Sequence, residues 1–121
     1  MKSLPGLILV LILLFSGCSG ETIQVEEDEV IGEMSQDQLT IFNSSDQSIY
    51  YAIFDQSILP FILWAPISSD ENKISGFHKK SFRITDILRE GQTTGTIVFY
   101  FWTGENPESG AINFLTFEIS E

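Results

Sequence analysis

Residues 96–102 read Thr-Ile-Val-Phe-Tyr-Phe-Trp (TIVFYFW), and this run is the strongest strand signal in the chain. β-Branched and aromatic side chains fit the pleated, half-buried surface of a sheet. Successive side chains of a strand point to opposite faces. One face of this run therefore carries Ile97, Phe99 and Phe101, and the other carries Val98, Tyr100 and Trp102. Both faces are apolar, whereas a sandwich strand with one solvated face is polar on that side.

Shorter β-rich runs lie on both sides of this stretch, separated by clusters of turn residues. They are QLTIFN (38–43), SIYYAIFD (48–55), SFRIT (81–85) and AINFLTFEIS (111–120). ILPFILWAP (58–66) is apolar but contains two prolines, which predicts an edge strand or an irregular crossover. Residues 85–91 (TDILREG) predict a single helical turn. Short strands at this spacing predict an all-β fold, a small antiparallel immunoglobulin-like β-sandwich, with a small β-barrel as the alternative.

The first 17 residues have the pattern of a secretory signal peptide. Lys2 is followed by an apolar run from Leu4 to Phe15 and then by the small residues Ser16 and Gly17. The apolar run is shorter than the roughly 20 residues of a membrane-spanning helix. We therefore expect residues 1–17 to be removed on export.

The end of this segment, Phe15-Ser16-Gly17-Cys18, resembles the lipobox of bacterial lipoproteins, although leucine is usual at the position of Phe15. The resemblance implies that Cys18 is lipidated and becomes the first mature residue, with acyl chains such as palmitate that anchor it to a membrane. Ser19 follows the cysteine, which in this family favours the outer membrane, on its periplasmic side or at the cell surface. The alternative is an ordinary secretory signal with an incidental cysteine.

Residues 18–37 are polar and acidic, with four consecutive acids at Glu26–Glu29. We expect this stretch to be a flexible acidic linker between the lipidated Cys18 and a β-sandwich domain at 38–121, with room for one edge strand around Val30. In some lineages such an acidic cluster also resembles a surface-export signal. The chain from Cys18 onward holds 17 acidic and five basic residues, a formal net charge of −12. This charge disfavours binding to nucleic acid.

Few residues of this chain are suited to catalysis or metal binding. His78 is the only histidine, and Cys18, the only cysteine, is assigned to lipidation. We therefore expect no catalytic residues, no metal site and no cofactor. A weaker possibility is an inhibitor, because Asn106, Pro107 and Gly110 resemble the Asn-Pro-x-x-Gly loop of chagasin-like cysteine-protease inhibitors, whose other binding loops are missing here.

From about Leu39 to Ile119 the chain loosely resembles small bacterial lipoproteins of unknown function. The residues that carry this resemblance are Asn43, Ser45, Ile49, Tyr50, Tyr51 and Phe99 to Trp102. It implies a β-sandwich in the bacterial cell envelope and no known activity.

The aromatic side chains opposite the expected core face suggest a function. If the two aromatic strands are neighbours, one outward patch forms from Tyr50, Phe54, Tyr100 and Trp102. Exposed apolar patches of this kind mark partner sites. The alternative is that residues 58–66 or the N-terminal segment cover this face and make a second small core. We therefore expect a non-enzymatic, lipid-anchored envelope protein that binds a protein or glycan, with an inhibitor, an accessory enzyme or a structural subunit as alternatives.

Overall fold

The computed structural model describes residues 23–120, and these form eight strands and four short helical turns. In chain order the elements are β1 (Ile23–Glu27), β2 (Val30–Ser35), β3 (Gln38–Asn43), β4 (Ile49–Asp55), η1 (Gln56–Phe61), η2 (Asp70–Asn72), β5 (Lys73–Ile74), β6 (Lys79–Arg83), α2 (Ile84–Ile87), β7 (Gly95–Trp102), η3 (Ser109–Ala111) and β8 (Asn113–Ile119). The signal-peptide and lipidation predictions fall on residues that lie outside the described part.

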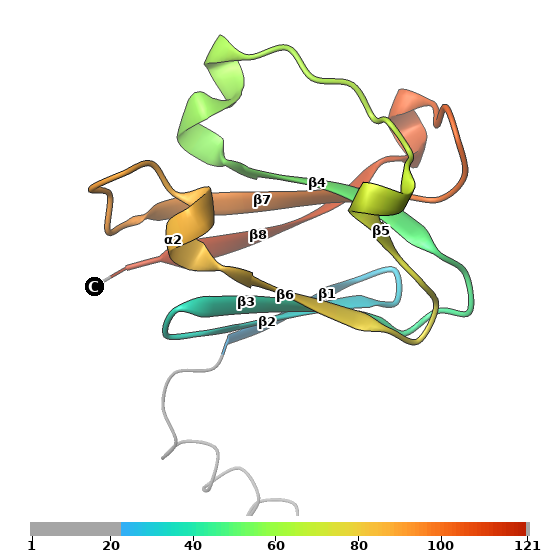
Figure 1. The fold of residues 1–121 in the computed structure, drawn as a ribbon, viewed down its shortest axis with the longest axis horizontal. Helices are drawn as coiled ribbons and strands as arrows, with labels where there is room; N and C mark the ends of the chain where they lie inside the picture. Colours follow the sequence, from blue (N-terminus) through green and yellow to red (C-terminus); the bar gives the residue numbers. More distant parts are fainter. Residues whose placement is uncertain (1–22, 121) are drawn as a thin grey trace, which may run out of the picture.

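The strands form two antiparallel four-stranded sheets that pack face to face (Figure 1). Sheet A has the order β1-β2-β3-β6, and sheet B has the order β5-β4-β7-β8. The predicted β-sandwich is therefore confirmed, rather than the small barrel. Strands β2, β3 and β6 in one sheet and β4, β7 and β8 in the other match strands A, B, E and C, F, G of an immunoglobulin-like sandwich. Helix α2 makes the crossover from sheet A to sheet B.

The sandwich begins earlier than the sequence predicts. β1 and β2 lie within residues 18–37, which were expected to be a linker, and β2 contributes Val30 and Met34 to the core. The acidic residues between Glu26 and Asp37 occupy exposed positions of the strands and their turns, as at Glu33 between buried Gly32 and Met34. A strand with one solvated face tolerates such charges, so the charge density concealed the alternation.

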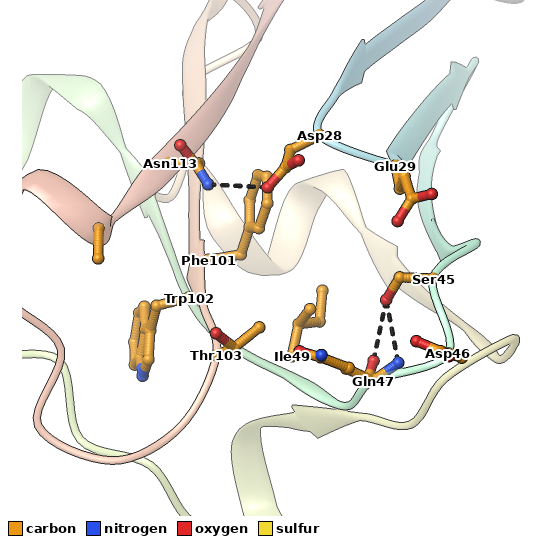
Figure 2. Close-up of a pocket in the computed structure, with 11 residues that line it drawn as sticks. Asp28, Glu29, Ser45, Asp46, Gln47, Ile49, Phe101, Trp102, Thr103 and Asn113 are labelled. Carbon is orange, nitrogen blue, oxygen red and sulfur yellow. Dashed lines mark hydrogen bonds between the residues drawn. The ribbon is translucent and has the colours of Figure 1, made fainter.

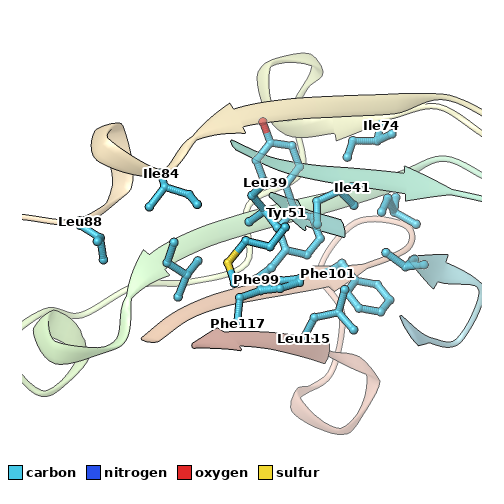
Figure 3. Packing of buried hydrophobic residues seen from close by; sticks show 14 residues of the cluster. Leu39, Ile41, Tyr51, Ile74, Ile84, Leu88, Phe99, Phe101, Leu115 and Phe117 are labelled. Atoms are coloured by element: carbon cyan, nitrogen blue, oxygen red, sulfur yellow. The ribbon is translucent and has the colours of Figure 1, made fainter. Parts of the chain in front are cut away.

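The core lies between the two sheets (Figure 3). Its buried residues come from both sheets. They include Leu39 and Ile41 of β3, Tyr51 of β4, Phe99 and Phe101 of β7, and Leu115 and Phe117 of β8. Tyr51 stacks on Phe99 with ring centroids 5.3 Å apart. Because both sheets and this core are built from residues 23–120, we expect a chain that starts at Ser19 to fold on its own.

Strand β7 has an inner and an outer row of buried side chains. The inner row, Ile97, Phe99 and Phe101, faces the core. In the outer row Val98 and Trp102 are also buried, at 3% and 1% exposure. Sheet A cannot cover this outer row, because it lies on the opposite side of sheet B. A second covering layer is therefore needed, and its position defines the candidate site.

Candidate functional site

The outer face of sheet B gathers the four aromatic residues that the sequence singles out. Strands β4 and β7 are neighbours, and their register places Tyr50 opposite Trp102 and Phe54 opposite Val98, with Tyr100 between them on β7. The rings of Phe54 and Tyr100 lie 6.3 Å apart between centroids. β4 and β7 are therefore neighbours, which was the condition for these four side chains to share one face of the sheet.

This cluster is covered by residues 62–69, which connect η1 to η2 and which we call the covering segment. Its Trp64 ring lies over the cluster, with centroids 4.7 Å from Tyr100, 5.3 Å from Phe54 and 6.3 Å from Trp102. Figure 1 shows this segment arching over sheet B on the side away from sheet A. Aromatic pairs at such distances stabilise a contact beyond the area that they bury.

Hydrogen bonds hold the far end of the covering segment to the sheet. The indole Nε1 of Trp102 donates to Ser68 Oγ at 2.9 Å, and Ser68 Oγ donates to the carbonyl of Gly104 at 2.7 Å. Asn72 Nδ2 donates to the carbonyls of Ile67 and Tyr51, at 2.7 and 2.9 Å. A buried indole N–H needs an acceptor. Ser68 provides this acceptor for the Nε1–H of Trp102, which burial has removed from water.

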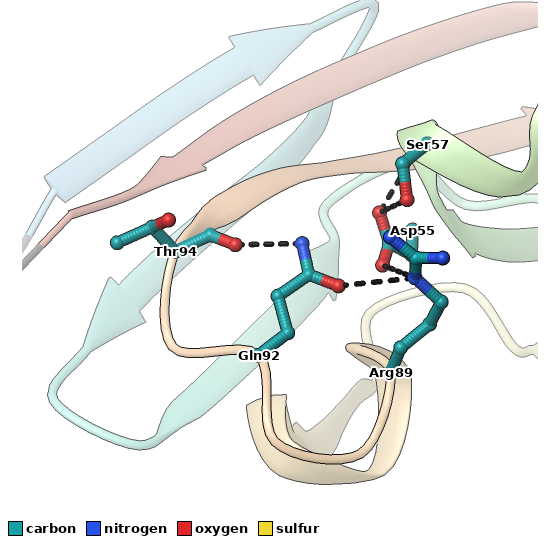
Figure 4. Close-up of polar contacts among 5 residues, drawn as sticks. All are labelled: Asp55, Ser57, Arg89, Gln92 and Thr94. Atoms are coloured by element: carbon teal, nitrogen blue, oxygen red, sulfur yellow. Dashed lines mark hydrogen bonds and ion pairs between the residues drawn. The ribbon is translucent and has the colours of Figure 1, made fainter.

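The near end is fixed by Asp55, the last residue of β4, which is 1% exposed (Figure 4). Its Oδ1 accepts hydrogen bonds from Ser57 N at 3.0 Å and Ser57 Oγ at 2.9 Å, which caps η1. Its Oδ2 makes no hydrogen bond among the described residues and lies 3.9 Å from Arg89 Nε. Asp55 therefore joins η1, which leads into the covering segment, to the loop before β7.

The four aromatic residues consequently do not form an open patch, and the expectation of one is corrected. Trp102 is 1% exposed, and Tyr50, Phe54 and Tyr100 are half-buried. The alternative, that residues 58–66 cover this face, is the one that the structure bears out. The physical reason is that an uncovered face of this size would leave four large aromatic side chains in water.

The covering segment presents apolar side chains to solvent as well as to the sheet. Its side chains alternate, so that Ile62, Trp64, Pro66 and Ser68 are half-buried and the residues between them are exposed. We call Phe61, Leu63 and Ile67 the apolar ridge; these side chains are 85%, 102% and 69% exposed. No charged residue occurs from Gln56 to Ser69. Three exposed large apolar side chains within seven residues of a charge-free stretch are a candidate contact surface.

A hollow of about 260 Å³ lies between the β1–β2 turn, the β3–β4 loop and the end of β7 (Figure 2). Three acidic residues line it, Asp28, Glu29 and Asp46, together with polar and apolar groups. Asn113 Nδ2 donates to Asp28 Oδ2 at 3.4 Å across the hollow. Within residues 23–120 no group of three histidine, cysteine, aspartate or glutamate side chains is placed to hold a metal ion.

His78, the only histidine of the chain, lies in the β5–β6 turn and is exposed. Its Nδ1 lies 2.8 Å from the carbonyl of Gly76, in its own turn. No carboxylate contact to this ring is found among the described residues, so they do not form a serine–histidine–acid arrangement.

Comparison with protein-family models, with curated proteins and with solved structures finds no match. In the part that the structure describes, no helix is long and apolar enough to cross a membrane. The functional interpretation therefore depends on the geometry of the domain itself.

Sequence reasoning missed the apolar ridge. The sequence signal for it is the charge-free run 61–67, in which every residue is apolar although alternate positions face the sheet and the solvent. The two prolines of residues 58–66 predict an edge strand or an irregular crossover, because proline is disfavoured inside a sheet, and they do not indicate which side chains are exposed.

Proposed function

We propose that this protein is a lipid-anchored domain of the bacterial cell envelope that binds a partner protein through the apolar ridge and is not an enzyme. The observation that carries the proposal is the exposure of Phe61, Leu63 and Ile67. The motif Ser16-Gly17-Cys18 supports the lipid anchor. Among residues 23–120 the only hydrogen bond of the His78 ring is to the Gly76 carbonyl of its own turn, which supports a binding role.

The distance between anchor and domain supports a protein partner rather than the anchoring membrane. Cys18 precedes Ile23 by five residues, which span at most about 18 Å when fully extended. Ile23 begins β1 in sheet A, whereas the apolar ridge lies beyond the outer face of sheet B (Figure 1). Stacked sheets are about 10 Å apart, and the covering segment adds a further layer. A tether of this length attached to sheet A therefore favours orientations in which the ridge is not the surface nearest the membrane.

The size and charge of the ridge also fit such a contact. Burying an exposed phenylalanine, leucine or isoleucine contributes about 1.5–3 kcal/mol each. The domain repels acidic partners at long range because of its net charge of −12, but the ridge itself brings no charge into the contact. A partner with a neutral apolar groove therefore gains burial energy without having to remove water from a charged group.

The lipid anchor is tested in cells that process the chain, by metabolic labelling with an alkyne analogue of palmitate. We expect the label on the wild-type protein and none on Cys18→Ser. Label that persists on Cys18→Ser contradicts the anchor.

The ridge is tested by photo-crosslinking in the lipidated protein. A benzophenone side chain replaces Leu63, and the control places it at Thr116, an exposed residue of β8 on the outer face of sheet B. We expect a discrete protein adduct from position 63 that disappears when Phe61 and Ile67 are changed to serine. Equal adducts from both positions, or adducts to lipid only, contradict the proposal.

A further inference from the structure

The outer face of sheet A, opposite to the ridge, carries side chains in two ordered rows. Strand register sets Ile31 beside Phe42, with Glu26 and Lys79 at the two ends of this row. The parallel row is polar throughout and consists of Gln24, Glu33, Thr40 and Ser81. Thr40 Oγ1 and Ser81 Oγ share a hydrogen bond of 2.9 Å. The face therefore presents Ile31 and Phe42, which we call the apolar strip, alongside a row of hydrogen-bonding groups.

Phe77 adds an aromatic ring to the apolar strip from a strained position. It lies in the tight turn between β5 and β6 with φ of +62° and is 64% exposed. This left-handed conformation is unfavourable for bulky residues and favours glycine. Its amide donates to the carbonyls of Asn43 at 2.8 Å and Ser45 at 3.1 Å, which holds the conformation in place.

The glycine of this turn is needed one position earlier. A Cβ on Gly76 would approach the backbone carbon of Asp46 to 2.7 Å, so only glycine fits there. Packing does not require a large side chain at position 77, since Phe77 is 64% exposed. A strained, exposed aromatic residue is a marker of function when neither packing nor turn geometry requires it.

The apolar strip and Phe77 line a hollow of about 380 Å³. Its apolar lining is Ile31, Phe42 and Phe77, and its polar lining is Gln24, Glu33, Thr40 and Lys79. The hollow lies on the face of the sheet, where the strand backbones are already paired with one another. A ligand is therefore recognised here by its side groups and not by strand addition.

We propose that this hollow binds an uncharged sugar unit of an envelope polysaccharide. A pyranose ring has an apolar face of C–H groups, which suits the Phe42 and Phe77 rings, and a rim of hydroxyls that both donate and accept hydrogen bonds. The Gln24 amide and the Thr40 hydroxyl do both, Glu33 accepts and Lys79 donates. The lining holds one carboxylate and one ammonium group, Glu26 lies beside it at the end of the apolar strip, and the acidic domain repels anionic polysaccharides. This site is separate from the ridge and goes beyond the proposed function.

The test is to add sugar probes to the isotope-labelled chain that starts at Ser19 and to monitor the chemical shifts of its backbone amides by NMR. The probes are hexasaccharides of β-1,4-glucose, β-1,3-glucose, α-1,4-glucose and β-1,4-N-acetylglucosamine, with hexagalacturonate as the acidic comparison. We expect at least one neutral probe to give saturable shifts centred on Ile31, Phe42 and Phe77. No saturable shift with any neutral probe, or tighter binding of hexagalacturonate, overturns the proposal.

Phe77→Gly separates recognition from packing. We expect it to weaken sugar binding at least tenfold while it raises Tm by about 4 °C, because glycine removes the strain of the left-handed position. Unchanged binding, or a lower Tm that assigns Phe77 to packing, overturns the proposal. Phe114→Ala, an exposed phenylalanine of sheet B, is the matched control and leaves binding unchanged. Leu63→Ser also leaves it unchanged, so failure here is distinct from failure of the ridge.

Discussion

Changing Trp64 to alanine tests whether the covering segment is part of the folded core. Trp64 is the side chain that joins this segment to sheet B, and its ring lies within 6.3 Å of three aromatic rings, measured between centroids. Its neighbour Leu63 points the other way and is fully exposed. The two residues therefore form a matched pair on opposite faces of one segment.

The expected loss of stability follows from the burial of Trp64. Replacing a fully buried tryptophan with alanine costs about 3–5 kcal/mol, and we expect about 2 kcal/mol here because Trp64 is only partly buried. Loss of the closest aromatic pair, with Tyr100 at 4.7 Å, adds about 1 kcal/mol. We therefore expect Trp64→Ala to lower the free energy of unfolding by about 3 kcal/mol, or Tm by about 15 °C for a domain of this size.

The assay is urea unfolding of the chain that starts at Ser19, followed by circular dichroism and by fluorescence. The chain has two tryptophans, so Trp64→Ala leaves Trp102 as the only emitter. Its emission should shift to the red as the cover is lost. Leu63→Ala should change the free energy of unfolding by less than about 0.5 kcal/mol, since its side chain makes no buried contact.

A loss below about 1 kcal/mol for Trp64→Ala, with unchanged emission from Trp102, would refute this reasoning. Such a result would mean that the covering segment is a loose loop. Equal losses for Trp64→Ala and Leu63→Ala would refute the assignment of inner and outer faces.

Three further substitutions test single contacts, each by urea unfolding. Asn43 is fully buried and its side chain makes four hydrogen bonds, so Asn43→Ala should cost about 3 kcal/mol; a loss under about 1 kcal/mol would contradict this. A Cβ on Gly32 would approach Phe117 Cζ to 2.3 Å in the core, so Gly32→Ala should cost about 1–3 kcal/mol, and a neutral effect would show that the ring moves freely. Ser68→Ala leaves Trp102 Nε1 without its acceptor and should cost about 1–2 kcal/mol, whereas no loss would mean that water replaces the hydroxyl.

The fold class was predictable because β-strand alternation survives in most of this chain. Residues 96–102 and 48–55 are instead rich in β-branched and aromatic side chains on both faces, and β4 and β7 are neighbours in the sheet, which was the condition for the aromatic cluster. Strands β1 and β2 were harder to find because their exposed positions hold a dense run of acids around Glu26–Glu29. A high density of charged residues indicates exposure to solvent. Both a linker and the outer face of a sheet are exposed, so charge density does not distinguish them.

The candidate site was only partly predictable, because sequence alternation does not say what covers a face. The apolar outer row of β7 required either a partner or a segment of the same chain. Residues 62–69 supply that cover through Trp64, and they in turn expose Leu63. Likewise, the left-handed backbone of Phe77 depends on the close approach of Gly76 to Asp46, a tertiary contact that spacing along the chain does not reveal.

The most direct test of the account is the accessibility of Trp102 in the Trp64→Phe variant, which keeps an aromatic cover and leaves one tryptophan. Acrylamide quenching and the emission maximum of the folded chain that starts at Ser19 measure it. The account predicts blue-shifted emission and weak quenching, because Trp102 is 1% exposed beneath the covering segment. Red-shifted emission with strong quenching would show an open aromatic face, and the contact surface would then be that face instead of the apolar ridge.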